Sequence, residues 1–195
     1  MNFEELGIKV GISGRHIHLD SEKMETLFGT TDLEIMKSLV QPGEFASAST
    51  VDIKVKDKVI PNIRVLGPLR SSHQLELSAS DCRKLKVSAP VANSAQQVTN
   101  DFEYEIIGPK GTVVVNTNCI IARAHIHLDL VTAERIGFSH GQLVAVRIEN
   151  QNRQGIIENA ICRVNEKYLP EFHIDTDEAS AFMESGVASN FTFVK

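Results

Sequence analysis

The chain has 195 residues, of which 42% are apolar and 23% charged, and its formal net charge is −5. Such a composition is ordinary for a globular protein with a buried core, and the acidic balance disfavours general nucleic-acid binding. No run of about 18 apolar residues predicts a membrane span, and the opening MNFEELGIKV does not resemble a secretory signal. We therefore expect a cytoplasmic protein without a membrane or nucleic-acid partner.

Short segments rich in valine and isoleucine predict many β-strands, separated by turn signals such as Gly67-Pro68 and Gly108-Pro109. The predicted strands are 8–13, 51–59, 62–66, 74–78, 103–107, 112–115, 119–121, 143–148 and 160–164. This spacing favours barrels or sandwiches over a βαβ sheet.

Four short helices are predicted between these strands, at 20–28, 78–85, 129–136 and 175–183. Each has a polar opening and a few apolar residues at helical spacing. For the first, we expect Ser21 as the N-cap and Gly29 as the stop.

The three cysteines, Cys82, Cys119 and Cys162, are far apart and form no C-x-x-C pair. This argues against a thiolate zinc site, a redox pair or a disulfide framework. We expect each to be a buried small apolar residue rather than a nucleophile.

An internal repeat organises the chain. GRHIHLDSEKMETLFG (14–29) and RAHIHLDLVTAERIG (123–137) share HIHLD, then a short helix, then glycine, and GPLR (67–70) and GPKG (108–111) echo each other more weakly. Such self-similarity predicts two related units, and so two small β-barrels that share a boundary.

The two His-x-His pairs, His16/His18 and His125/His127, indicate metal binding. Side chains at i and i+2 of a strand point to one face, about 6.6 Å apart, and two imidazoles so placed can converge on one zinc ion. Random placement of seven histidines gives roughly 0.25 such pairs per chain, so two pairs within an identical HIHLD are hard to attribute to chance. The alternative is a duplication in which these histidines are structural residues on exposed strands.

Two pairs supply four ligands, enough for one closed structural site or two open catalytic ones. His173 lies opposite the flanking Phe172 and Ile174, and Glu76 shares a face with Gln74. His73 is a neighbour of that strand, whereas His140 precedes Gly141 in a turn and is expected at the surface. If Glu76 and His173 each join a pair, the chain has two three-ligand sites, each with a position open for water or substrate.

Several segments together resemble PduL-type phosphate acyltransferases, in order and from about residue 8 to residue 180. They are GISGRHIHLD, LVQPGEFAS (39–47), VLGPLRSSHQLELS (65–78), IARAHIHLD (121–129) and FHIDTDEA (172–179). The resemblance implies a mainly β fold of two small β-barrels capped by short helices, with the active site between them. One barrel would take residues 15–122, and the other residues 1–14 plus 123–195.

The resemblance also implies reversible transfer of an acyl group, acetyl or propanoyl, between coenzyme A (CoA) and phosphate at a two-zinc site. One ion would be bound by His16, His18 and Glu76, the other by His125, His127 and His173. Arg70 would bind phosphate, with further pocket residues at Gln41, Glu44, Gln74, Ser94 and Arg163. The implied partners are acyl-CoA or CoA, phosphate and acyl phosphate, and a homo-oligomer stays open.

The sequence departs from the family at Ala124, where arginine is usual, and at Gly14, where asparagine is common. Neither change removes an implied metal ligand. Only about seven residues precede the first predicted strand, so we expect no microcompartment-targeting helix.

Two other functions remain compatible with the same histidines. One is a dinuclear zinc hydrolase of a thioester, an amide or a phosphoester, in which water replaces phosphate as the nucleophile. The other is a non-enzymatic binding module stabilised by zinc in closed four-ligand coordination.

Overall fold

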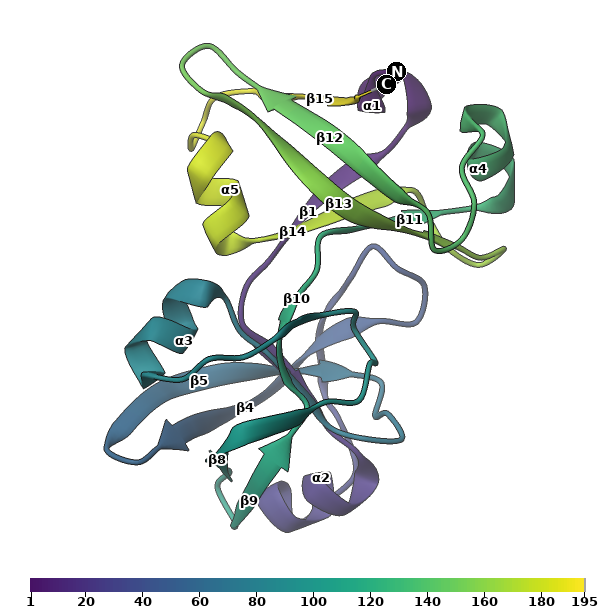
Figure 1. The fold of residues 1–195 in the computed structure, drawn as a ribbon. Helices are drawn as coiled ribbons and strands as arrows, with labels where there is room; N and C mark the ends of the chain where they lie inside the picture. The colour runs from purple at the N-terminus through teal and green to yellow at the C-terminus, as the bar shows by residue number, and fades with distance from the viewer. Residues whose placement is uncertain (195) are drawn as a thin grey trace. The chain divides into compact units, whose positions relative to one another are not determined.

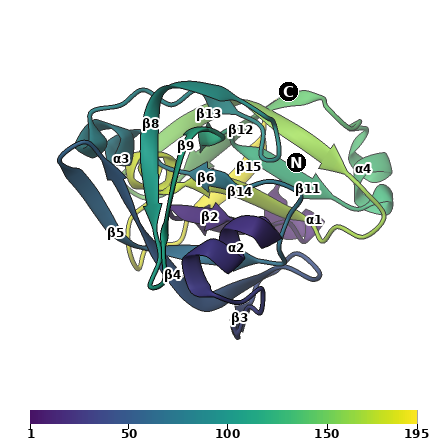
Figure 2. The same cartoon turned by 90° about the horizontal axis from the view of Figure 1, so that it is seen from below.

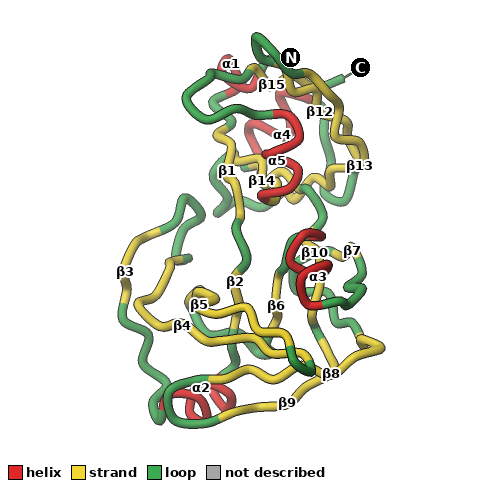
Figure 3. Tube along the Cα trace, turned by 90° about the vertical axis from the view of Figure 1, so that its left-hand side faces the viewer, coloured by secondary structure: helices red, strands yellow, loops and turns green. Residues whose placement is uncertain are grey.

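The computed structural model describes residues 1–194 and shows a mainly β protein with a few short helices (Figures 1 and 3). The chain divides into two compact units. Unit 1 comprises Met1–Ser13, Val40–Pro42 and the segment from Arg123 onward, and unit 2 comprises Gly14–Leu39 and Gly43–Ala122. Lys195, the last residue of the second barrel expected from the sequence, lies outside the described residues.

Unit 1 contains a six-stranded sheet in the order β1-β14-β11-β13-β12-β15. Its elements are α1 (Phe3–Leu6), β1 (Lys9–Ser13), β11 (His125–Leu128), α4 (Leu130–Ile136), β12 (Leu143–Glu149), β13 (Gln154–Val164), β14 (Glu171–Asp175), α5 (Thr176–Phe182) and β15 (Asn190–Phe193). Both ends of the described chain lie in this unit, where the amide of Phe193 donates to the carbonyl of Met1 at 3.0 Å.

Unit 2 contains a nine-stranded sheet in the order β7-β10-β6-β2-β5-β4-β8-β9, with β3 paired to β4. Figure 2 shows β4, β5, β8 and β9 of this sheet together with α2. Its elements are β2 (His16–His18), α2 (Ser21–Phe28), β3 (Ile35–Ser38), β4 (Phe45–Val55), β5 (Lys58–Gly67), β6 (Gln74–Glu76), α3 (Ala79–Leu85), β7 (Val91–Ala92), β8 (Thr99–Ile107), β9 (Thr112–Thr117) and β10 (Cys119–Ala122). Each unit is thus a curled half-barrel sheet with short helices, and the predicted fold class is confirmed.

Each unit has its own apolar core. In unit 1, Ile126, Leu128 and Phe172 are fully buried, and the ring of Phe3 packs edge-on against that of Phe172. In unit 2 the corresponding positions are Ile17 and Leu19. Fully burying one such side chain contributes about 1.5–3 kcal/mol, so these cores hold the two HIHLD strands firmly in place.

The repeated HIHLD segment now has a physical explanation at every position. The histidines alternate with the core residues Ile and Leu along each strand. The final aspartate is the N-cap of the following helix: Asp20 accepts from the amide of Lys23 at 2.9 Å, and Asp129 accepts from the amide of Thr132 at 2.8 Å. The repeat therefore specifies a strand, its buried face and the start of a helix in five residues.

The four predicted helices are all present, each beginning one residue later than expected because the first polar residue is the N-cap. The prediction of Ser21 as the N-cap of α2 is wrong, since Asp20 has the extended conformation and accepts the capping bond. The single predicted strand 51–59 is also wrong: the chain turns at Lys56, which has a φ of 52°, so β4 and β5 form a hairpin.

Within the described residues, no helix is long and apolar enough to cross a membrane.

Candidate functional site

In unit 2, the first His-x-His strand lies between two neighbours in a fixed register. β2 pairs in parallel with β5 and antiparallel with β6. His16 lies opposite Glu76, and His18 lies opposite Gln74. These four polar residues therefore form a two-by-two grid on one face of the sheet.

Unit 1 repeats the same arrangement around the second pair. β11 pairs in parallel with β13 and antiparallel with β14. His125 lies opposite His173, and His127 lies opposite Glu171. The register places His173 where unit 2 has Glu76, and Glu171 where unit 2 has Gln74.

The structure brings together two groups of side chains that could hold a metal ion: His16, His18 and Glu76 (the unit 2 triad) and His125, His127 and His173 (the unit 1 triad). In each triad the ligand atoms lie within 4.8 Å of one another. The members are buried except for His173, which is half-buried.

Backbone carbonyls orient the first histidine of each pair. Nδ1 of His16 lies 2.9 Å from the carbonyl oxygen of Gly14, and Nδ1 of His125 lies 2.9 Å from that of Arg123. A carbonyl oxygen only accepts hydrogen bonds, so both Nδ1 atoms carry the proton and Nε2 is the ring nitrogen that can bind a metal. The departure from the family at Gly14 leaves this contact intact, because the contact uses the backbone.

Unpaired buried nitrogens are consistent with metal binding at the triads. Nδ1 of His18 in unit 2 and Nδ1 of His127 in unit 1 are buried without a hydrogen-bond partner. An unmet buried polar atom costs about 1–3 kcal/mol, and a cation at either triad would offset that cost. Imidazole and carboxylate together are donors that suit zinc.

The electrostatic surroundings of His18, His125 and His127 keep these three imidazoles neutral. Burial, His16 and the Arg70 charge hold the pKa of His18 far below its usual value. Burial, Arg163 and His173 lower the pKa of His125 well below its usual value, and burial, His173 and Arg163 lower the pKa of His127 to about 3. A histidine must be neutral to bind a metal, so these shifts favour binding at neutral pH.

These shifts predict that the zinc-free protein loses stability in acid. The folded pKa of His127 is about 3 against 6.5 for an ordinary histidine, so the unfolded chain binds the extra proton between these values. Stability is therefore greatest above pH 6.5 and falls as the pH drops toward 3. We expect a lower free energy of unfolding, by denaturant titration in chelator, at about pH 5 than at about pH 7.

His127→Gln should reduce the difference in the free energy of unfolding between the two pH values. His140→Gln, at an exposed position, should leave that difference unchanged. An equal difference in the His127→Gln protein and the wild type would contradict the explanation.

A short loop fixes the carboxylate of Glu76. The hydroxyl of Ser94 donates to Oε1 of Glu76 at 2.8 Å, which leaves Oε2 on the side of His16 Nε2, 3.4 Å away. Gln74 anchors the same loop: its Oε1 accepts from the amide of Ala95 at 2.7 Å, and its Nε2 donates to the carbonyl of Gln96 at 3.1 Å. In this structure, Ser94 and Gln74 position Glu76.

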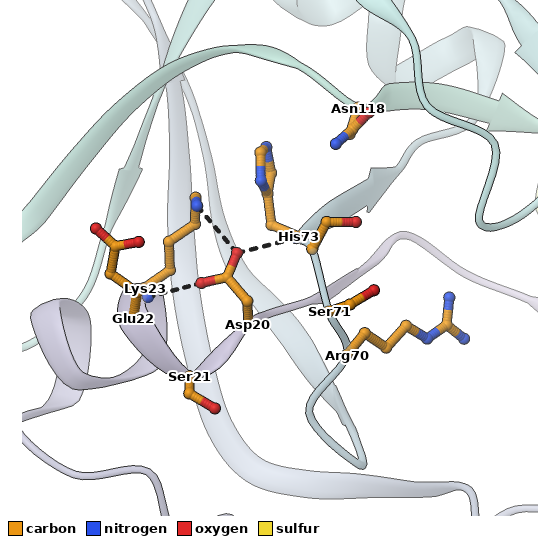
Figure 4. Close-up of a pocket in the computed structure, with 9 residues that line it drawn as sticks. Asp20, Ser21, Glu22, Lys23, Arg70, Ser71, His73 and Asn118 are labelled. Atoms are coloured by element: carbon orange, nitrogen blue, oxygen red, sulfur yellow. Dashed lines mark hydrogen bonds and ion pairs between the residues drawn. The ribbon is translucent and has the colours of Figure 1, made fainter.

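Arg70 follows β5 and lines a pocket of about 580 Å³ with the start of α2 (Figure 4). Its amide donates to the carbonyl of Leu19 at 2.9 Å, and its Nη2 lies 3.6 Å from Oε1 of Glu44. The guanidinium points away from the ion pair of Asp20 and Lys23 in the same pocket. A backbone anchor thus holds a half-buried cation within electrostatic reach of His18.

Arg163 and Gln41 lie in unit 1. Arg163 pairs in register with His127, and its charge lowers the pKa of both His125 and His127. Gln41 donates from Nε2 to the carbonyl of Leu169 at 3.0 Å and to Oε2 of Glu171 at 2.8 Å. Each triad therefore has one arginine close by, Arg70 for unit 2 and Arg163 for unit 1.

Sequence reasoning missed Glu171 and Gly11. Burial alone would raise the pKa of Glu171, but His173 and Gln41 outweigh it and hold the pKa below its usual value. A Cβ at Gly11 would lie 2.7 Å from Oε1 of Glu171, so a larger residue there would displace the carboxylate from its present position. The signal for Glu171 was its place two residues before His173, on the same strand face.

Other candidates lie outside the triads. Nε2 of His73 donates to the carbonyl of Thr117 at 3.0 Å, and His140 is exposed. Cys82, Cys119 and Cys162 are free and buried, as predicted. Burial raises the pKa of the Cys162 thiol to about 11, which makes it a poor nucleophile.

Comparison with known proteins identifies the class. A family model described as phosphate propanoyltransferase matches residues 9–185. A phosphate propanoyltransferase of Thermotoga maritima is 42% identical over 181 residues, covering 92% of this chain and 86% of that protein. Those of Levilactobacillus brevis and Salmonella typhimurium are 39% and 37% identical over 174 residues, covering 89% of this chain and 83% and 82% of theirs.

These matches place the chain in a class of enzymes, the phosphate acyltransferases. Within that class, the chain belongs to the phosphate propanoyltransferase family.

Proposed function

We propose that this protein interconverts acyl-CoA plus phosphate with acyl phosphate plus CoA, using one zinc ion on each triad. The acyl group is acetyl or propanoyl. The observation that carries the proposal is the repeated grid of buried ligands in a chain that belongs to the phosphate propanoyltransferase family.

The donor sets support catalytic rather than structural zinc. Each triad supplies three protein donors, and three-ligand zinc sites keep a position open for water or substrate. Bound zinc would supply Lewis acidity, which holds phosphate oxygens, polarises a carbonyl or stabilises a thiolate. The carbonyls of Gly14 and Arg123 hold the His16 and His125 rings in orientations that point Nε2 of each ring away from the backbone contact.

Arg70 is the residue that we assign to phosphate. A guanidinium can donate two parallel hydrogen bonds to a phosphate, which fixes its orientation as well as its charge. Glu44, 3.6 Å from Nη2 of Arg70, helps to hold the guanidinium in place. Orienting phosphate matters because alignment of reactants can lower a barrier by up to about 7–11 kcal/mol.

The reaction is a direct displacement without an acyl-enzyme. A phosphate oxygen attacks the thioester carbonyl carbon, a C–O bond forms, and the C–S bond breaks as the electron pair leaves with the CoA sulfur. Negative charge builds up on the carbonyl oxygen during the attack, and a nearby cation stabilises it. Arg163, beside the unit 1 triad, is our candidate for that charge.

The test incubates the zinc-loaded protein with acetyl-CoA or propanoyl-CoA and measures both free thiol and acyl phosphate. We expect the two products in equal amounts, at a rate that depends on phosphate concentration. Thiol released with free carboxylic acid and at a rate independent of phosphate would instead identify a thioester hydrolase and contradict the proposal.

A further inference from the structure

Glu171 is a buried carboxylate that the mechanism above does not use. It is 5% exposed, lies two residues before His173 on β14 and faces His127 across the sheet. Its Oε2 lies 2.7 Å from Nε2 of His173. A ring nitrogen of the unit 1 triad and a carboxylate thus meet in the interior at hydrogen-bond distance.

The orientation of His173 shows which nitrogen faces the other histidines. β14 lies between β1 and β11. A Cβ at Gly11 of β1 would lie 3.2 Å from Cδ2 and 3.3 Å from Nε2 of His173, so that edge of the ring lies over β1. Nδ1 is across the ring from this edge, and β11, on the other side of β14, holds His125 and His127.

Gln41 and the backbone at Gly11 hold the carboxylate of Glu171 in place. Nε2 of Gln41 donates to Oε2 of Glu171 at 2.8 Å, and Gln41 itself is fixed by the backbone carbonyl and amide of Leu169, at 3.0 Å and 3.3 Å. The missing side chain at Gly11 leaves the space that Oε1 fills. Two neighbouring elements thus keep a buried charge at one nitrogen of His173.

A comparison of the two units indicates why unit 1 has a carboxylate at position 171. The unit 2 triad contains the carboxylate Glu76, and its grid neighbour Gln74 is neutral. The unit 1 triad contains only imidazoles, and its grid neighbour at the same place is Glu171. Each grid therefore carries one carboxylate, and a divalent cation at either triad would leave the same net charge.

We propose that Glu171 is a positioning residue that accepts a hydrogen bond from Nε2–H of His173, directs Nδ1 to the metal position of unit 1 and offsets the charge of the ion. The inference rests on the proposed function, because it needs zinc at the unit 1 triad. Carboxylates that bind the far nitrogen of a ligating histidine fix the ring and strengthen the ligand, and their loss weakens metal binding by about 10- to 100-fold.

The test measures zinc affinity in the full-length chain by competition with a chromophoric chelator. The background His18→Ala isolates the unit 1 triad, and the background His127→Ala isolates the unit 2 triad. Glu171→Gln keeps the shape of the side chain and removes its charge. Glu158→Gln, at an exposed position on β13 of the same sheet, is the matched control.

In the His18→Ala background, we expect Glu171→Gln to weaken zinc binding by about 10- to 100-fold and Glu158→Gln to leave it unchanged. In the His127→Ala background, Glu171→Gln should have no effect. With cobalt in place of zinc, the visible spectrum of the unit 1 site should shift in Glu171→Gln, which a general loss of stability would not produce. If Glu171→Gln does not fold, Gln41→Leu should give a smaller loss in the same direction.

Unchanged affinity at the unit 1 triad, or an equal loss at both triads, would overturn the role of Glu171 while leaving the zinc enzyme intact. A wild-type protein that binds no zinc at all would overturn both proposals at once.

Discussion

His125→Ala should remove one zinc ion per chain and lower phosphate-dependent acetyl-CoA cleavage by about 10³-fold or more, because a catalytic metal supplies several kcal/mol of transition-state stabilisation. His125 is buried, its Nδ1 donates to the Arg123 carbonyl, and its Nε2 is free for the ion. His16→Ala should have the same effect through the other triad, since His16 occupies the equivalent place in the unit 2 grid. Metal analysis and turnover assays on the same samples measure the zinc content per chain and the rate of acetyl-CoA cleavage.

The matched control for the histidine variants is His140→Ala. His140 is an exposed histidine outside both triads, and we expect this variant to keep two zinc ions and the wild-type rate. If His125→Ala lost one zinc ion yet kept the full rate, the unit 1 ion would be structural, and the catalytic assignment would be wrong.

Arg70→Lys should lower kcat/KM for phosphate by about 10²- to 10³-fold, the usual cost of losing one well-placed charged donor. Lysine keeps the positive charge but cannot donate two parallel hydrogen bonds, so the variant separates geometry from charge. The KM for acetyl-CoA should change little, because we assign Arg70 to phosphate alone. Initial rates with each substrate varied at saturating levels of the other give the two constants.

Arg83→Lys on α3 is the control, since Arg83 is exposed and donates to Ser80 beside it. It should leave both constants unchanged. Equal losses for phosphate and acetyl-CoA in Arg70→Lys would mean that Arg70 supports the fold of the site rather than binding phosphate.

Much of the strand framework follows from local pattern. The alternation around His173 predicts that Phe172 and Ile174 face the core while His173 faces the other way. The structure confirms that Phe172 and Ile174 are buried in the core. The repeated HIHLD predicts two related units, and the same paired grid occurs in both. The polar residue that opens each helix predicts where the helix begins, to within one residue.

The errors come from interactions that local pattern does not contain. The 51–59 segment reads as one strand because Val55 and Val59 continue the alternation across a tight turn at Lys56. Glu171 lies two residues before His173 on one strand, but its importance depends on register: only the pairing of β14 with β11 and β1 places it opposite His127 and close to Gly11. The contact of Gln41 with Glu171 joins residues 130 positions apart, beyond the reach of any local signal.

The most direct test of this account is a zinc titration of the chelator-treated protein, followed by the rate of acetyl phosphate formation from acetyl-CoA and phosphate. We predict no activity in the metal-free protein and a linear recovery that reaches its plateau at two zinc ions per chain. A metal-free protein that forms acetyl phosphate at the full rate would contradict the account.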